Sequence, residues 1–161
     1  MRHLGVAGGP IDMMIRFVET GLFEAAISHN RFTLLNREAD PLWEVCTRRG
    51  VAALNAAPYG SGLLAKGPGA YPRYMYHQAS PQLLRRAGQM EEACERYGLP
   101  LASAALQFSL RDVRIALFYS DVGGMWLQTA LEATATVRIL GPYRMVSRDV
   151  KYKISELVAA K

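Results

Sequence analysis

The chain has 161 residues, of which 50% are hydrophobic and 20% are charged, and its formal net charge is +5 with a pI near 9.4. This composition is typical of a soluble globular protein with one core, and the longest apolar stretches are shorter than the roughly 18 residues that a membrane span needs. The N-terminal residues predict a strand and a turn, so we expect no signal peptide. Cys46 and Cys94 have 47 residues between them and lie in helical patterns. We expect reduced thiols in a cytoplasmic protein, with a disulfide or metal pair as the alternatives.

The positive charge does not indicate a nucleic-acid partner. Two arginine pairs, at residues 48–49 and 85–86, fall at the ends or outer faces of predicted helices. The other basic residues cluster in the tail: Arg144, Arg148, Lys151, Lys153 and Lys161. No basic stripe interleaved with aromatic residues follows one element, so solvated helix faces are expected. Preference for an anionic cofactor accounts for the charge as well as nucleic acid does.

Three strand-and-helix units follow one another from the N-terminus. Residues 4–7 predict a short strand, and the following helix has Pro10 at its first position and ends at Gly21. Residues 24–28 predict the second strand, and Asp40 is expected to cap the next helix. Residues 51–56 are small and apolar, which is typical of a strand covered on both faces.

The stretch from residue 54 to 65 is the most informative part of the chain. The third strand runs into Pro58 and then into a turn that contains Gly60 and Gly62. A strand ends in this way when its carboxyl edge must bring bare backbone against a ligand. This pattern predicts a binding loop at the end of the third strand.

Residues 58–79 predict a long loop, and a loop of this length in a compact domain is more often functional than idle. Three tyrosines of this loop, with two basic residues, could form a lid or a substrate wall: Tyr71, Tyr74 and Tyr76 with Arg73 and His77. The alternative is that the loop packs on itself.

The remaining elements complete a half-barrel pattern. Ser80-Pro81 is expected to cap a long helix that ends at Gly98, and Pro100 begins a shorter helix. The further predicted elements are a strand at 113–119, a helix at 126–139 and an amphipathic helix at 149–161. Because parallel crossovers are right-handed, successive strands should pair. The fold class is therefore α/β, half a TIM barrel with about four parallel strands, and the predicted division is 1–141 for this domain and 142–161 for a basic amphipathic helix.

Several segments, in this order, resemble the C-terminal half of the aldo/keto reductases. The segments are Gly5–Pro10, His29–Leu35, Leu54–Pro68 and Leu101–Phe108. The most similar group comprises the sugar and pyridoxal dehydrogenases that act on D-threo-aldoses, L-fucose or pyridoxal. The resemblance covers about residues 2–112 and implies a TIM barrel that binds NAD or NADP at the carboxyl ends of its strands.

The resemblance also implies where the proton-transfer groups lie. The family uses a tyrosine acid/base with a lysine, an aspartate and a histidine, and all four belong to the first half of the barrel, before the matching region. The tyrosines of this chain lie in other elements, so we assign no catalytic residue and no metal ligand. The implied function is the cofactor-binding half of an NAD(P)-dependent oxidoreductase for sugar-like alcohols or aldehydes, inactive alone.

Seven cofactor-binding residues carry over from the family by position. Ala7 and Gly8 fall where the family often has a Ser-Asn pair at the nicotinamide carboxamide, so only their backbone groups can act there. His29 falls where a glutamine usually assists, with a buried, satisfied imidazole as the alternative. The other four match the loop that crosses the pyrophosphate: Ala57, Tyr59, Gly60 and Ser61. Backbone N–H groups in such a loop can bind anionic oxygens.

The resemblance fades after about Asp112. The family follows its last strand with a glycine and basic residues, whereas this chain has Asp121 there, which would repel the 2′-phosphate of NADP. Divergence or a changed reading frame would both explain the loss, and a truncated or mis-started gene is an open alternative at Met1.

A non-enzymatic half-barrel is the second hypothesis. Half a barrel exposes two sheet edges and an apolar inner face. Burying ~1,000 Å² of apolar surface is worth on the order of 25 kcal/mol before ordering costs. We therefore expect self-association or pairing with another chain.

Overall fold

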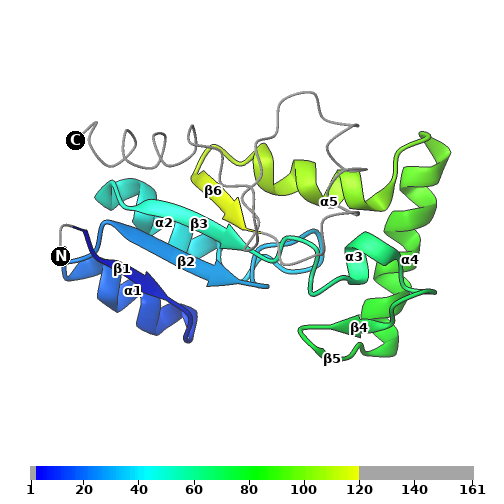
Figure 1. Cartoon of the computed structure of the whole chain (residues 1–161), viewed down its shortest axis with the longest axis horizontal. Coiled ribbons are helices and arrows are strands. Elements are labelled where there is room, and N and C mark those ends of the chain that lie inside the picture. The colour runs from blue at the N-terminus through cyan, green and yellow to red at the C-terminus, as the bar shows by residue number, and fades with distance from the viewer. Residues whose placement is uncertain (1–2, 120–161) are drawn as a thin grey trace, which may run out of the picture.

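The computed structural model describes residues 3–119, which form a four-stranded parallel sheet with flanking helices (Figure 1). The strands are β1 (Gly5–Ala7), β2 (Ala25–His29), β3 (Ala52–Ala56) and β6 (Ile115–Tyr119). They lie in the order β1-β2-β3-β6 and every pairing is parallel. The prediction of about four parallel strands is confirmed.

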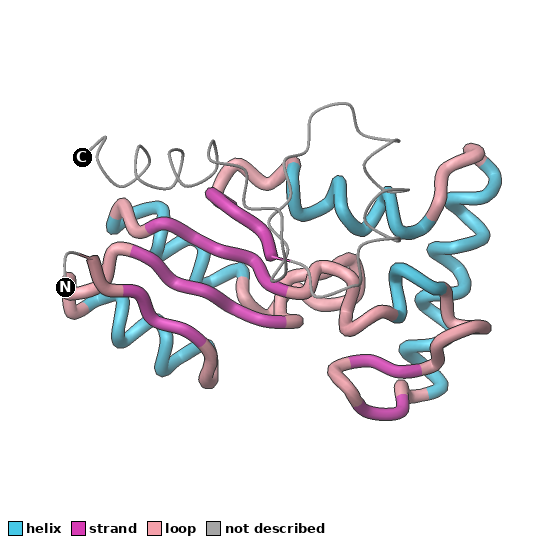
Figure 2. Tube along the Cα trace, viewed as in Figure 1, coloured by secondary structure: helices cyan, strands magenta, loops and turns pink. Residues whose placement is uncertain are grey.

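Two helices cover one face of this sheet. They are α1 (Ile11–Glu19) and α2 (Asp40–Arg49), which lie together behind the strands in Figure 2. The first core cluster fills the space between these helices and the sheet, and its largest members are Met14, Phe32, Leu42 and Trp43. Because side chains alternate along a strand, Ala26 and Ala53 reach this cluster while their neighbours in sequence face the other way.

The second core cluster lies beyond the carboxyl ends of the strands. The elements there are α3 (Leu63–Lys66), α4 (Pro81–Arg96), α5 (Leu101–Leu110) and a hairpin of β4 (Arg73–Tyr74) and β5 (His77–Gln78). They bury an apolar set that includes Tyr59, Leu63, Leu64, Ala87 and Leu106. The prediction of one continuous loop over 58–79 is therefore wrong, since this stretch contains a helical turn and a two-stranded hairpin.

The structure corrects two helix starts and confirms a third. Pro10 is the N-cap of α1 rather than its first residue, and Ala39 rather than Asp40 is the N-cap of α2. The Asp40 carboxylate instead accepts hydrogen bonds from Arg37 Nε at 2.8 Å and Arg114 Nη2 at 2.6 Å. Burial acts to raise the pKa of Asp40, but these two arginines outweigh it and lower the pKa. Ser80 caps α4 as expected, because its hydroxyl accepts from the Leu83 amide at 3.2 Å.

The two cysteines are both free thiols. Cys46 is buried under the sheet and Cys94 is half-buried on α4. Within residues 3–119, no helix is long and apolar enough to cross a membrane. The predicted helices at 126–139 and 149–161, the division at residue 141 and Asp121 all lie outside the described residues.

Candidate functional site

The ends of three neighbouring strands bring several of the predicted site residues to one edge of the sheet. Ala7 pairs with Ile27, and the Gly8 amide donates to the Ile27 carbonyl at 3.3 Å. His29 pairs with Ala56, the last residue of β3. Because the strands are parallel, their carboxyl ends form a single rim, as in other α/β barrels. We call this edge, with the loop 57–62 that follows β3, the rim.

The loop after β3 is a tight turn that leads directly into α3. Ala57, Gly60 and Ser61 all have left-handed backbone, with φ of 56°, 58° and 59°. The Gly60 amide donates to the Ala57 carbonyl at 3.0 Å, and the Gly62 amide donates to the Tyr59 carbonyl at 3.2 Å. The Gly60 amide was predicted to be able to bind an anionic ligand, but in this structure it is hydrogen-bonded within the turn.

The two glycines of this loop make room for tyrosine rings. A Cβ at Gly60 would overlap the ring of Tyr74, and one at Gly62 would lie 3.3 Å from the ring of Tyr71. Tyr74 is itself anchored, because its hydroxyl lies 3.1 Å from Thr33 Oγ1 and donates to the Asn30 carbonyl at 3.2 Å. Burial raises the pKa of Tyr74. These fits hold the hairpin against the rim.

Tyr59 points away from the rim. Its side chain has no exposed surface and belongs to the second core cluster, where its hydroxyl has no hydrogen-bond partner. Burial raises the pKa of Tyr59 to about 12. Of the predicted cofactor-binding residues, Tyr59 can therefore meet a ligand at the rim only through its backbone.

His29 is the polar centre of the rim, and its contacts with two neighbouring side chains were not predicted from the sequence. Asn30 Nδ2 lies 3.0 Å from His29 Nδ1 and donates to Ser61 Oγ at 3.0 Å. The Tyr76 hydroxyl lies 3.2 Å from His29 Nε2, and the two rings are stacked with their planes 9° apart. Of the three loop tyrosines expected to form a lid or wall, Tyr76 is the one that reaches His29. Asn30 gave a weak signal, since asparagine after a strand favours left-handed backbone.

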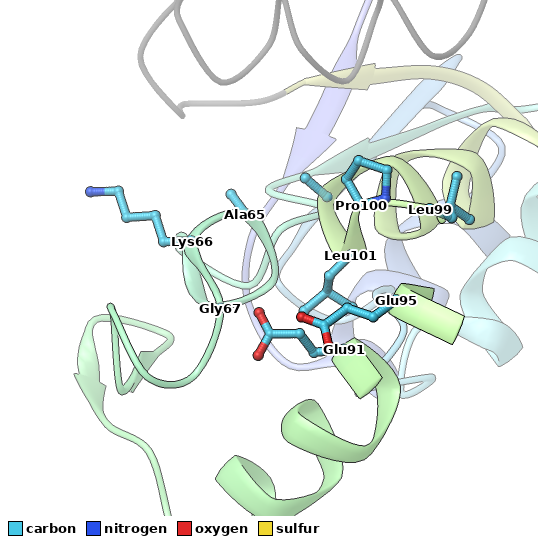
Figure 3. Close-up of a pocket in the computed structure, with 9 residues that line it drawn as sticks. Ala65, Lys66, Gly67, Glu91, Glu95, Leu99, Pro100 and Leu101 are labelled. Atoms are coloured by element: carbon cyan, nitrogen blue, oxygen red, sulfur yellow. The ribbon is translucent and has the colours of Figure 1, made fainter. Parts of the chain in front are cut away.

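A separate pocket of about 230 Å³ lies between α3, α4 and α5, away from the rim (Figure 3). None of the seven predicted site residues lines it. Its charged lining consists of Glu91 and Glu95 of α4 and Lys66 of α3, and Figure 3 shows Lys66 pointing away from the two carboxylates. Burial, and then the charge of Glu95, raise the pKa of Glu91. Two carboxylates disfavour an anionic dinucleotide, so the rim is the better candidate site.

Comparison with known proteins decides the family. The model of the aldo/keto reductase family matches residues 1–128 of the chain. The chain belongs to the aldo/keto reductase family. The match runs past Asp112, so the resemblance extends further along the chain than the sequence segments indicated.

Two curated members of the family are similar to parts of the chain. Pyridoxal 4-dehydrogenase from Microbacterium luteolum is 28% identical over 95 residues, which cover 58% of this chain and 28% of that protein. D-threo-aldose 1-dehydrogenase from a Pseudomonas species is 26% identical over 117 residues, which cover 71% of this chain and 36% of that protein. The matched region thus spans about a third of the length of each relative.

Solved structures of the same family share the fold. The apo form of an aldo-keto reductase from Bacillus halodurans superposes with a TM-score of 0.65 at 14% identity, over 97% of this chain and 50% of that chain. Its holo form gives a TM-score of 0.62 at 15% identity, with the same coverage. The chain therefore has the fold of half an aldo/keto reductase barrel.

Among residues 3–119, no group of three His, Cys, Asp or Glu side chains could hold a metal ion.

Proposed function

We propose that the rim binds the nicotinamide and pyrophosphate parts of NAD or NADP, in an oxidoreductase that acts on sugar-like alcohols or aldehydes. The observation that carries this proposal is the convergence of His29, the end of β1 and the loop 57–62 at one edge of a parallel sheet. Membership of the family supports the reaction class, and the names of the two curated relatives support the substrate class.

Within the rim, the proposed contacts differ in kind. The carboxyl end of β1 offers only backbone groups, at Ala7 and Gly8, to a nicotinamide carboxamide. His29 offers an imidazole, and Ser61 offers a hydroxyl that already accepts from Asn30. A bound nicotinamide would supply the hydride chemistry, and the part of this chain's residues is to bind and orient it.

We further propose that the chain does not turn over substrate by itself. A phenol has an ordinary pKa near 10, so a tyrosine acid/base needs a cationic neighbour at its hydroxyl. Lys66 is the one lysine between residues 3 and 119, and its Nζ lies 5.1 Å from the centroid of the Tyr71 ring, over the ring face. The buried Tyr59 and Tyr74 have raised pKa values, which makes proton release near neutral pH harder.

The test is a binding titration of the purified chain with reduced nicotinamide mononucleotide, NADH and NADPH, followed by nucleotide fluorescence. Adenosine monophosphate is the matched control ligand, added as a non-fluorescent competitor of the reduced mononucleotide, because the proposed contacts are on the nicotinamide side. We expect weak binding of the mononucleotide, a loss of about threefold to tenfold in affinity in His29→Ala from one lost hydrogen bond, and no turnover with L-fucose or pyridoxal. Turnover well above background, or equal binding of adenosine monophosphate, would contradict the proposal.

Self-association is proposed for the same preparation. Within the described residues, β1 is an edge strand, and large apolar side chains are exposed before β1, on α1 and after α1: Leu4, Met13, Phe17 and Leu22. Unpaired edges and apolar surface favour pairing with another copy. Light scattering that shows a stable monomer at high concentration would count against it.

A cytoplasmic location stays a prediction from the two thiols.

A further inference from the structure

Both ring nitrogens of His29 have a hydrogen-bonding neighbour, and this fixes where the ring proton lies. Asn30 Nδ2 is 3.0 Å from Nδ1, and the Tyr76 hydroxyl is 3.2 Å from Nε2. An amide nitrogen carries two N–H donors and cannot accept a hydrogen bond. The two acceptors around Asn30 Nδ2 are His29 Nδ1 and Ser61 Oγ, one for each donor. Nδ1 is therefore unprotonated, and Nε2–H donates to the Tyr76 oxygen.

The opposite orientation of the Asn30 amide is less favourable. The side chain is buried, with Asn30 only 1% exposed, and its Oδ1 has no partner in the present orientation. Turning the amide over would place the NH₂ group at that unpartnered position and leave two buried donors unsatisfied instead of one acceptor. Each buried unsatisfied group is costly, so burial favours the orientation in which Nδ2 faces His29.

The backbone around these side chains is left-handed at three positions, two of which carry residue types that adopt this conformation rarely. Asn30 has φ of 60°, and its amide donates to the Ala56 carbonyl at 3.0 Å. Met75 and Tyr76 form the two-residue turn between β4 and β5, with φ of 51° and 68°. Turns with positive φ at both positions usually contain Asn-Gly, and neither residue here is of that kind. Strain of this sort persists only where the surroundings enforce it, and it is concentrated at functional sites.

The strained turn presents Tyr76 to His29. The ring centroids are 5.8 Å apart with nearly parallel planes, while Tyr74 of the same hairpin is anchored to Thr33 and to the Asn30 carbonyl. The hairpin therefore contacts residues at both nitrogens of His29: Tyr74 holds the Asn30 backbone, Asn30 contacts Nδ1, and Tyr76 contacts Nε2.

We propose that Asn30 is a positioning residue that fixes His29 as an Nε2–H donor on the rim, and that Tyr76 occupies this donor until the carbonyl oxygen of a ligand replaces it. A fixed N–H donor selects a carbonyl or carboxamide oxygen over an amine or amide N–H. The identity of that oxygen as the nicotinamide carboxamide rests on the proposed function, whereas the state of His29 in the free protein does not.

The test is ¹⁵N NMR of the uniformly labelled full chain, in which long-range ¹H–¹⁵N correlations distinguish protonated from unprotonated ring nitrogens. His29→Gln identifies the His29 signals among the three histidines. We expect an unprotonated Nδ1 and a protonated Nε2 in the wild type. Asn30→Asp keeps the shape and tolerates the left-handed backbone but can only accept from the ring, so the proton should move to Nδ1.

Tyr76→Phe is the matched control, because it keeps the stacked ring and removes only the hydroxyl. The Nε2–H form should persist in this variant. A wild-type ring with its proton on Nδ1, or a Tyr76→Phe ring that changes tautomer, would overturn the proposal. If Asn30→Asp does not fold, the wild-type and Tyr76→Phe spectra still decide between these outcomes.

Titration of the same samples with reduced nicotinamide mononucleotide separates this proposal from the proposed function. We expect the His29 Nε2 signal to shift on binding, and Tyr76→Phe to bind about twofold to tenfold more tightly because no hydroxyl has to be displaced. An Nε2–H ring that does not respond to the nucleotide leaves the positioning by Asn30 intact and contradicts the proposed function. If the chain binds the nucleotide but its His29 proton lies on Nδ1, the proposed function stands and the positioning by Asn30 is contradicted.

Discussion

The sheet with its two helices and the unit at the strand ends are built by different means. In the sheet layer, large apolar side chains fill a common space, and Met14, Phe32 and Trp43 are each at most 1% exposed. In the strand-end unit, particular pairs fit one another, such as Gly60 with the ring of Tyr74 and Ser61 with Asn30. Generic packing tolerates substitutions of similar size and polarity, whereas pairwise fits depend on residue identity.

Backbone strain separates the same two regions. In the described part of the chain, every non-glycine residue with positive φ lies at a strand end or in the hairpin: Asn30, Ala57, Ser61, Met75 and Tyr76. Residues within the strands and helices need no such conformation. The sheet layer thus supplies stability, and the rim holds the unusual backbone that a binding site requires.

The largest effect is expected in the sheet layer, from Trp43→Ala. The indole is fully buried and meets Phe32 edge-on at 6.3 Å between centroids. Its removal should lower the free energy of unfolding by about 3–5 kcal/mol, measured by urea denaturation. Trp43→Phe is the control, because it keeps an aromatic ring and removes an indole N–H that has no hydrogen-bond partner. A loss under about 1 kcal/mol in Trp43→Ala would show that this layer is not the stable part of the molecule.

A somewhat smaller effect is expected in the strand-end unit, from Gly60→Ala. An alanine there must adopt φ of 58° and also displace the anchored ring of Tyr74. Gly21→Ala is the matched control, because Gly21 has φ of 74° but no atom within 4 Å of its Cβ position. We expect a loss of about 1–2 kcal/mol for Gly21→Ala from the backbone alone, and about 2–4 kcal/mol for Gly60→Ala.

Equal losses in these two variants would mean that Tyr74 moves aside freely and that the fit at the rim is not specific. Combining Gly60→Ala with Tyr74→Leu provides a second check, since the two changes share one contact. The loss of stability in the double variant should therefore be smaller than the sum of the losses in the two single variants.

The sheet layer was predictable from the sequence because its signals are local. Short apolar runs placed all four strands, and Ser80 before Pro81 placed the start of α4, where the hydroxyl accepts from the Leu83 amide. The prediction that Asp40 caps α2 was wrong, and the structure shows what the carboxylate does instead: it accepts hydrogen bonds from Arg37 and from Arg114, which is 74 residues away in sequence.

The rim was predictable only in outline. Its place at the ends of the strands followed from the order of the elements, and His29, Ser61 and Gly60 were singled out. The contacts of Asn30 with Ser61 and of Tyr76 with His29 join residues 31 and 47 positions apart, and no local pattern encodes them. The hairpin was missed because Met75-Tyr76 lacks the glycine or asparagine that usually marks such a turn.

The smallest expected effect is a loss of stability at alkaline pH, to which one buried group in each region contributes. Burial raises the pKa of Cys46, in the sheet layer, from 9.0 to about 11, and that of Tyr59, in the strand-end unit, from 10.0 to about 12. Both groups are neutral below these values, and the unfolded chain releases each proton at lower pH than the folded chain. The stability that depends on these two groups is therefore complete below about pH 9 and falls as the pH rises, first through Cys46 and then, above about pH 10, through Tyr59.

At pH 10, Cys46 should account for a loss of about 1 kcal/mol and Tyr59 for less than half of that, so Cys46→Ala should reduce the decline more than Tyr59→Phe does. Urea denaturation at pH 8, 10 and 11 measures both contributions. If the two regions unfold as one cooperative unit, both variants act on a single transition. If the strand-end unit opens first, Tyr59→Phe will change only an earlier transition and Cys46→Ala only a later one. That result would separate the rim from its scaffold energetically as well as structurally.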